Sequence, residues 1–301
     1  MRKIAFALCL AVIAASPAGA AWRDDLKVLK VGFVAGDNPA YEVARMEPFR
    51  QRLHYDLAVQ VELFPARSYQ ALIEAESSGR IQYAILSSTA YIALQQACQC
   101  AEALVQPTTA DRARGFRAVL VARADSPIQS LADARGARLA IGARDSISGR
   151  IAPYAGLAAQ GIDPENYFAR TFETEDAAAA LAALADGEAD IAVAWSTADD
   201  PTSTAAGSGP IADLAQQRAG SAPALKALWT SDLIPFGPHA IRTDLPPEAR
   251  AALADSLLNM KSMAPEAYDV VEPQFEGGFV MADPADFSRF SELLSSIEVP
   301  R

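Results

Sequence analysis

The residues best suited to bind a small anion are residues 145–149, an Asp-Ser-Ile-Ser-Gly segment. They follow a predicted strand that ends at Gly142 and overlap the start of a helical pattern at Ser148. Backbone N–H groups and two serine hydroxyls would meet there at the positive end of a helix dipole, which attracts anions. A serine that only caps the helix would explain Ser148 as well. The segment therefore predicts an anion site without establishing one.

A second hydroxyl-rich segment, Ser87-Ser88-Thr89, opens another helix directly after the strand predicted for residues 81–86. In an open α/β sheet, ligands bind outside the carboxyl ends of the strands. Both serine-containing segments follow strands. We therefore expect them to face each other across one cleft, with Ser88 among the residues that line it.

Cys98 and Cys100 are the two cysteines that lie beyond the N-terminal segment. Side chains two residues apart on a helix point about 200° from each other, so a disulfide between them requires a loop. Three interpretations stay open. The pair forms a local disulfide, remains as two half-buried thiols, or serves as a soft ligand pair for a thiophilic species.

Catalytic and metal-binding motifs are missing from the sequence. His54 and His239 are the only histidines, and neither belongs to a recognisable catalytic or metal-spaced pattern. No G-x-S-x-G, H-E-x-x-H or Gly-rich phosphate-binding motif occurs. We therefore expect a binding protein that is not an enzyme and has neither a metal nor a cofactor.

The chain has 301 residues and a net charge of −11, which disfavours nucleic acid as a partner. Residues 1–20 resemble an export signal, with Arg2 and Lys3 before a short apolar run and small residues up to Ala20. No later run has the roughly 20 apolar residues of a membrane helix. We predict cleavage after Ala20 and a mature protein in the periplasm that does not insert into the membrane.

Strand and helix patterns alternate along the chain. The predicted strands cover residues 27–35, 57–64, 81–86, 116–122, 138–142, 169–173, 190–194, 225–230 and 239–242. The predicted helices cover residues 39–53, 68–78, 87–97, 148–160, 176–185, 246–260 and 284–296. Two α/β halves of this kind favour two lobes over one continuous sheet. We expect lobe I to comprise residues 21–112 and 238–301, and lobe II residues 113–237.

Several ordered stretches of the sequence are typical of one family. They are Leu29-Lys30-Val31-Gly32-Phe33, Ala66-Arg67-Ser68-Tyr69, residues 79–84, residues 124–128, Ser146-Ile147-Ser148-Gly149, residues 161–164 and Leu228-Trp229-Thr230-Ser231. From residue 27 to the end, the chain resembles the periplasmic phosphonate-binding proteins of ABC importers. The resemblance implies an α/β, two-lobed, type II solute-binding fold with a ligand cleft between the lobes, and an ABC permease as partner.

The resemblance implies that some of the family's ligand residues have counterparts in this chain. One cleft tyrosine is present as Tyr69. Both serines of the family's Ser-Thr-Ser anion loop are present, as Ser146 and Ser148, but its threonine is replaced by Ile147. The second cleft tyrosine corresponds to Phe116, which has no hydroxyl.

Other ligand residues of the family are lost. Its histidine corresponds to Glu175, and its two amine-binding acids fall near Thr197 and on Gly237. The resemblance therefore does not favour aminoethylphosphonate. Because a buried anion needs donors, the remaining pocket suits phosphite, phosphate, a simple phosphonate or a neutral oxyacid.

Some relatives of the family sense arsenite with a cysteine and signal to a histidine kinase, which offers an alternative function. Arsenite is uncharged near neutral pH and prefers sulfur, so Cys98 and Cys100 would be its ligands. At about 1.5 Å per residue, however, the helix starting at Ser88 places them roughly 15 Å from the cleft mouth. Transport and sensing both stay open at this point.

Overall fold

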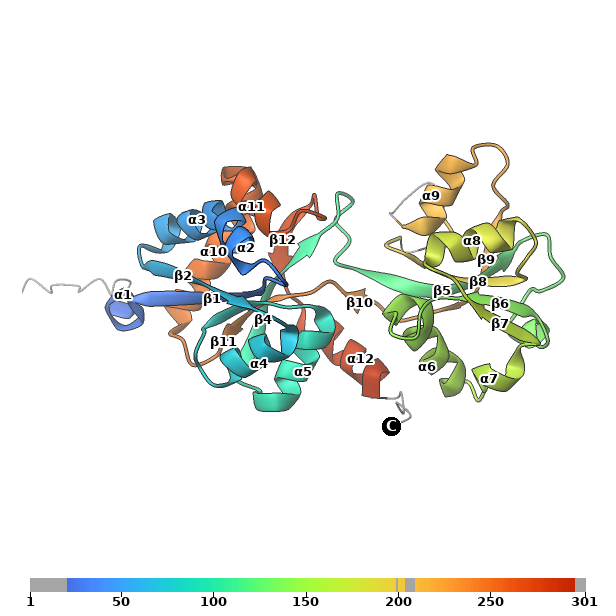
Figure 1. The fold of residues 1–301 in the computed structure, drawn as a ribbon, viewed down its shortest axis with the longest axis horizontal. Coiled ribbons are helices and arrows are strands. Elements are labelled where there is room, and N and C mark those ends of the chain that lie inside the picture. Colours follow the sequence, from blue (N-terminus) through green and yellow to red (C-terminus); the bar gives the residue numbers. More distant parts are fainter. Residues whose placement is uncertain (1–20, 199, 204–208, 296–301) are drawn as a thin grey trace, which may run out of the picture.

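The protein consists of two α/β lobes that lie side by side and are joined by two chain crossings (Figure 1). The structure is a computed structural model and describes residues 21–198, 200–203 and 209–295. Each lobe contains its own sheet, and no strand pairs across the two sheets among these residues. The predicted two-lobed fold class is therefore confirmed. The predicted signal, residues 1–20, lies outside the described residues.

Lobe I contains a six-stranded mixed sheet in the order β12-β4-β11-β3-β1-β2. Its strands are β1 (Val28–Val34), β2 (Gln60–Ala66), β3 (Tyr83–Ile85), β4 (Ala101–Thr108), β11 (His239–Arg242) and β12 (Gly278–Met281). Its helices are α1 (Ala21–Leu26), α2 (Pro39–Arg45), α3 (Glu47–Leu57), α4 (Tyr69–Ser77), α5 (Ser88–Cys98), α10 (Pro247–Met263), α11 (Pro265–Val271) and α12 (Pro284–Ser295). β1 pairs in parallel with β2 and β3, as the alternating pattern predicts. β11 and β12 return from the end of the chain and pair antiparallel.

The helices of lobe I pack around this sheet on an apolar core that includes Val31, Phe49 and Leu53. The helix predicted for residues 39–53 is in fact two helices, α2 and α3, which meet at Met46. Pro48 lies in the first turn of α3 and has no N–H to continue the bonding of α2, so the chain changes direction there.

Lobe II contains the sheet β10-β5-β8-β6-β7, with β9 paired to the other part of β5. Its strands are β5 (Gly115–Arg123), β6 (Arg138–Ile141), β7 (Arg170–Glu173), β8 (Ile191–Ser196), β9 (Leu225–Thr230) and β10 (Ile234–Pro235). Its helices are a 3₁₀ turn (Ala132–Ala134), a π-helical turn (Ile147–Ile151), α6 (Ala152–Ala159), α7 (Pro164–Tyr167), α8 (Ala177–Ala185) and α9 (Pro210–Gln217). β6 pairs in parallel with β7 and β8, again as predicted.

The chain passes between the lobes twice, once from β4 to β5 and once from β10 to β11. Arg114 joins the two crossings, because its carbonyl accepts the Phe236 N–H at 2.9 Å and the Gln106 Nε2–H at 2.6 Å. Its guanidinium Nε lies 3.0 Å from the buried Asp286 carboxylate of α12. The crossings are thus fixed to each other and to the C-terminal helix.

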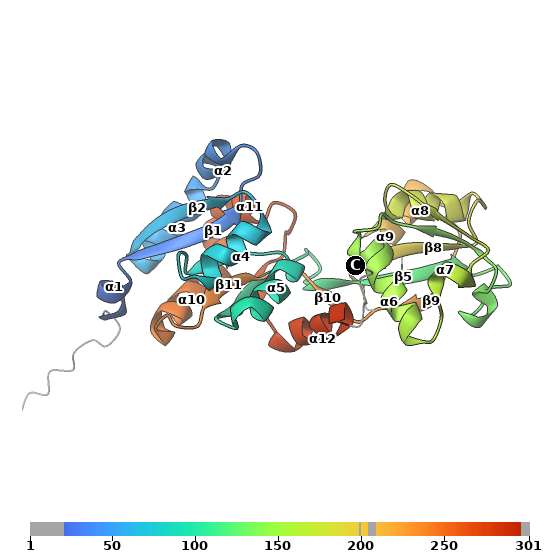
Figure 2. The same cartoon turned by 60° about the horizontal axis from the view of Figure 1, so that its bottom comes forward.

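Helix α12 lies beneath the crossings and contacts both lobes (Figures 1 and 2). It packs against α5 in lobe I and against α6 and β10 in lobe II. Phe287 and Phe290 of α12 belong to one apolar cluster that also includes Ala118 and Ala152 of lobe II. In the described part of the chain, no helix is long and apolar enough to cross a membrane.

Candidate ligand-binding cleft

A hollow of about 430 Å³ lies between the lobes at the edge where the strands of both sheets end. It is lined by Thr109, Phe116, Ser148, Trp195, Thr197, Phe236, Gln274 and Phe275. Thr109 follows β4, Ser148 follows β6 and Thr197 follows β8, so these side chains come from the carboxyl ends of strands. This is where open α/β sheets bind their ligands.

Two of the predicted site residues of lobe II, Phe116 and Ser148, line this hollow. The Ser146 hydroxyl instead accepts the Gly149 N–H at 3.0 Å and caps the π-helical turn. The interpretation of Ser148 as the helix cap is therefore wrong, because Ser146 is the cap. The Ser148 hydroxyl does not cap the helix. Ile147 packs against the apolar cluster that bridges the lobes.

The predicted residues of lobe I lie outside the lining of the hollow. Tyr69, at the start of α4, is 43% exposed. Burial raises the pKa of its phenol, a hydrogen bond with Ser87 opposes the rise, and the nearby Glu272 carboxylate adds to it. The phenol is thus a neutral donor at physiological pH. The Ser88 hydroxyl donates to the Pro235 carbonyl at the end of β10.

Glu175 is the remaining predicted residue. It is exposed, follows the end of β7 and directly precedes Asp176, the N-cap of α8. It does not line the hollow.

Four aromatic rings form most of the wall of the hollow, and sequence reasoning identified only one of them. Phe116 lies 5.8 Å from Trp195 and 6.2 Å from Phe236, and Phe236 lies 4.6 Å from Phe275, measured between ring centroids. The four rings are half-buried rather than part of either core. The sequence carries no signal that separates the other three rings from core residues.

The polar groups around the aromatic rings are hydroxyls, the Gln274 amide and one carboxylate. Asp111, in the first crossing, accepts hydrogen bonds from the Thr109 hydroxyl and, at 3.4 Å, from the Thr197 hydroxyl. A carboxylate thus lies beside Thr197, near which the family resemblance places one missing acid, but it comes from a different part of the chain. None of the residues that line the hollow is charged.

Behind the wall of lobe I, His239 is fully buried. Its Nε2 donates to Glu272 Oε1 at 2.8 Å, which leaves Nδ1 to accept from the Tyr83 hydroxyl. Both ring nitrogens are therefore occupied by hydrogen bonds within lobe I.

Cys98 and Cys100 form a disulfide. Cys98 ends α5 and Gln99 adopts a left-handed conformation with φ of 49°, so the chain leaves the helix between the two cysteines. Arg242 Nη1 lies 3.5 Å from Cys100 Sγ. In this form neither sulfur is a thiol, so a soft ligand would require prior reduction of the pair.

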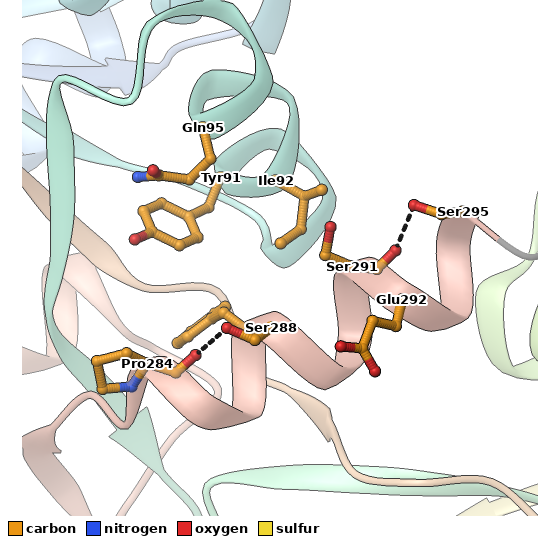
Figure 3. Close-up of a pocket in the computed structure, with 9 residues that line it drawn as sticks. Tyr91, Ile92, Gln95, Pro284, Ser288, Ser291, Glu292 and Ser295 are labelled. Atoms are coloured by element: carbon orange, nitrogen blue, oxygen red, sulfur yellow. Dashed lines mark hydrogen bonds between the residues drawn. The ribbon is translucent and has the colours of Figure 1, made fainter.

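A second hollow, of about 730 Å³, lies between α5 and α12 (Figure 3). Two of its three serine hydroxyls are engaged within α12, since Ser288 donates to the Pro284 carbonyl and Ser295 to the Ser291 carbonyl. None of the predicted ligand residues lines it. The interlobe hollow is therefore the better candidate.

Comparison with known proteins identifies the family of the chain. The family described as "ABC transporter, phosphonate, periplasmic substrate-binding protein" matches residues 31–287. The phosphonates-binding periplasmic protein of Escherichia coli is 27% identical over 262 residues, which cover 85% of this chain and 72% of the relative.

Two solved structures have the same fold at lower identity. A Xanthomonas citri protein bound to ATP has a TM-score of 0.58 and 20% identity, with 90% of this chain and 96% of the other covered. PhnD1 of Prochlorococcus marinus in complex with methylphosphonate has a TM-score of 0.52 and 18% identity, with 90% and 99% covered. Since the family match spans most of the sequence, this chain belongs to the periplasmic substrate-binding proteins of phosphonate ABC transporters.

Proposed function

We propose that the interlobe hollow binds a phosphorus oxyacid of the simple phosphonate class and that the protein delivers it to an ABC permease. The observation that carries the proposal is the position of Ser148 and Phe116, which line one hollow between the lobes. The first offers a hydroxyl for the oxyacid and the second an apolar face for a substituent on phosphorus.

The lining favours a phosphonate over inorganic phosphate or phosphite. An oxyanion without an organic group would meet four aromatic rings and few donors, which costs desolvation energy without replacement hydrogen bonds. A phosphonate carries a carbon substituent that can occupy the aromatic part of the hollow. The names of two relatives, a phosphonates-binding protein and a complex with methylphosphonate, belong to the same ligand class.

We further propose that lobe I comprises residues 21–112 and 238–301, and lobe II residues 113–237, with a hinge at the two crossings. Arg114 and Phe236 bond to each other between the crossings, so the two strands of the hinge would bend together. Binding proteins of two lobes commonly close on their ligand by such hinge motion.

Replacing Ser148 by alanine should weaken binding of methylphosphonate about ten- to a hundredfold. A hydrogen bond to a charged group contributes roughly 1.5–3 kcal/mol, and 1.4 kcal/mol corresponds to a factor of ten in affinity. Isothermal titration calorimetry on the mature protein measures the change directly.

Ser146→Ala is the matched control, two residues away in the same turn. It removes the cap to the Gly149 N–H and should lower stability by about 1 kcal/mol while affecting affinity less than Ser148→Ala. Unchanged affinity in Ser148→Ala, or in the double alanine variant, would place the anion site elsewhere.

A further inference from the structure

We propose that the four aromatic rings of the cleft hold an alkylated ammonium group, so that the ligand is a zwitterionic phosphonate. This inference rests on the proposed function and names the organic end of its ligand. The rings come from both lobes and the second crossing: Phe116 begins β5, Trp195 lies in β8, Phe236 follows β10 and Phe275 precedes β12. A group held by all four rings would contact both lobes.

The arrangement of the rings suits a rounded group better than a flat one. Phe116 and Trp195 are inclined by 61°, Phe116 and Phe236 by 37°, and Phe236 and Phe275 by 54°. Parallel planes would form a slot for a flat aromatic ligand, whereas inclined planes present faces from several directions. Such aromatic cages bind quaternary ammonium groups, because the negative face of each ring attracts the cation.

The charges around the hollow also favour a cation. The exposed Asp111 carboxylate borders it through Thr109 and Thr197. The arginines of the first crossing and of early β5 have partners other than Asp111. Arg112 donates to the Gly277 carbonyl and Arg117 to the Ser231 carbonyl. Arg114 forms ion pairs with Asp283 and Asp286. None of these three guanidinium groups pairs with Asp111, so an alkylammonium group in the cage would meet a carboxylate that they do not neutralise by an ion pair, whereas a neutral group of the same shape would gain nothing from it.

One hollow can bind both ends of a small zwitterion. The Ser148 hydroxyl lines the same hollow of about 430 Å³ as the four rings, so an oxyacid at Ser148 and a cation in the cage would belong to one molecule.

The test compares two ligands of nearly the same shape, (2-trimethylammonioethyl)phosphonate and its neutral isostere 3,3-dimethylbutylphosphonate, by calorimetry on the mature protein. We expect the ammonium compound to bind at least about tenfold tighter. Asp111→Asn and Trp195→Leu should each reduce this ratio, and Trp195→Phe, which keeps a ring, should largely retain it. Asp125→Asn, at the opposite end of β5, is the control and should leave the ratio unchanged.

Equal or tighter binding of the neutral isostere would overturn the inference while leaving the proposed function intact. Choline, which lacks phosphorus, separates the two proposals. If choline binds and Asp111→Asn weakens it, the cage is supported even when every phosphorus oxyacid fails to bind. Because Asp111 is exposed, its variant tests the inference should a Trp195 variant not fold.

Discussion

Replacing Glu76 by glutamine is expected to stabilise the protein by about 3 kcal/mol at pH 7. Glu76 lies on α4 with no exposed surface, and neither carboxylate oxygen has a hydrogen-bond partner among the described residues. Burial raises the pKa of this carboxyl from 4.5 to about 8, and the charge of Arg242 only partly opposes the rise. The folded protein thus holds the proton more tightly than the unfolded chain.

The sign of the pH dependence follows from that order of pKa values. Below pH 4.5 the carboxyl is neutral in both states and costs nothing. As the pH rises from 4.5 towards 8, the unfolded chain ionises first and stability falls by about 1.4 kcal/mol for each pH unit. Glutamine is neutral at every pH in this range, so the stability of the variant does not fall in this way.

Urea unfolding of both proteins between pH 5 and pH 8 measures the effect. Glu74→Gln, on the same helix but exposed, is the matched control and should change stability little at any pH. Parallel stability curves for Glu76→Gln and the parent protein would show that the Glu76 carboxylate is paired or hydrated in the folded state.

Gly237→Asp should lower the free energy of unfolding by about 3 kcal/mol and should not create an amine-binding acid. The family resemblance places one amine-binding acid at this position. In this fold, however, a Cβ on Gly237 would overlap the Leu86 carbonyl oxygen and come within 3.0 Å of Ser87 Cα. Both obstacles are backbone atoms, so a rotamer change cannot relieve the overlap, and overpacking of this kind is destabilising.

Thermal unfolding and titration with aminoethylphosphonate test this prediction together. Gly237→Ala should lose nearly as much stability as Gly237→Asp, because Cβ alone causes the overlap. Gln274→Glu, which adds an acid on the exposed lobe I side of the cleft, should keep the stability of the parent protein. A normal melting temperature for Gly237→Ala would mean that the second crossing shifts easily.

The sequence predicts the regular elements of this fold well where periodicity is strong. The bounds of β9 and β11 agree with the strands predicted for residues 225–230 and 239–242. The sequence pattern does not predict β4, since Pro107 interrupts it and the chain enters the strand directly from the cysteine pair. Its pairing with β11 and β12 decides its conformation, and that pairing depends on residues over 130 positions away.

The candidate site was predictable only in part. Ser148 is predicted because it follows a strand and lies in the family's serine-containing loop. Phe116 is predicted because it corresponds to a cleft tyrosine of the family. Trp195, Phe236 and Phe275 have the composition of core residues, so only the tertiary structure distinguishes rings that face a cleft from rings inside a lobe. Asp111 belongs to a crossing, and its proximity to Thr197 depends on how the two lobes meet.

The strand order of lobe I has a consequence for the way the protein acquires its structure. Among the strands that the structure describes, β4 pairs with β11 and β12 alone, so both of its edges stay unpaired until the last quarter of the chain has been made. The strands of lobe II, by contrast, all lie between residues 115 and 235. Lobe II can therefore complete its sheet first, and lobe I closes last because its contacts span the greatest sequence separation. Pulse-labelled hydrogen exchange during refolding should accordingly protect β5 and β8 before β4.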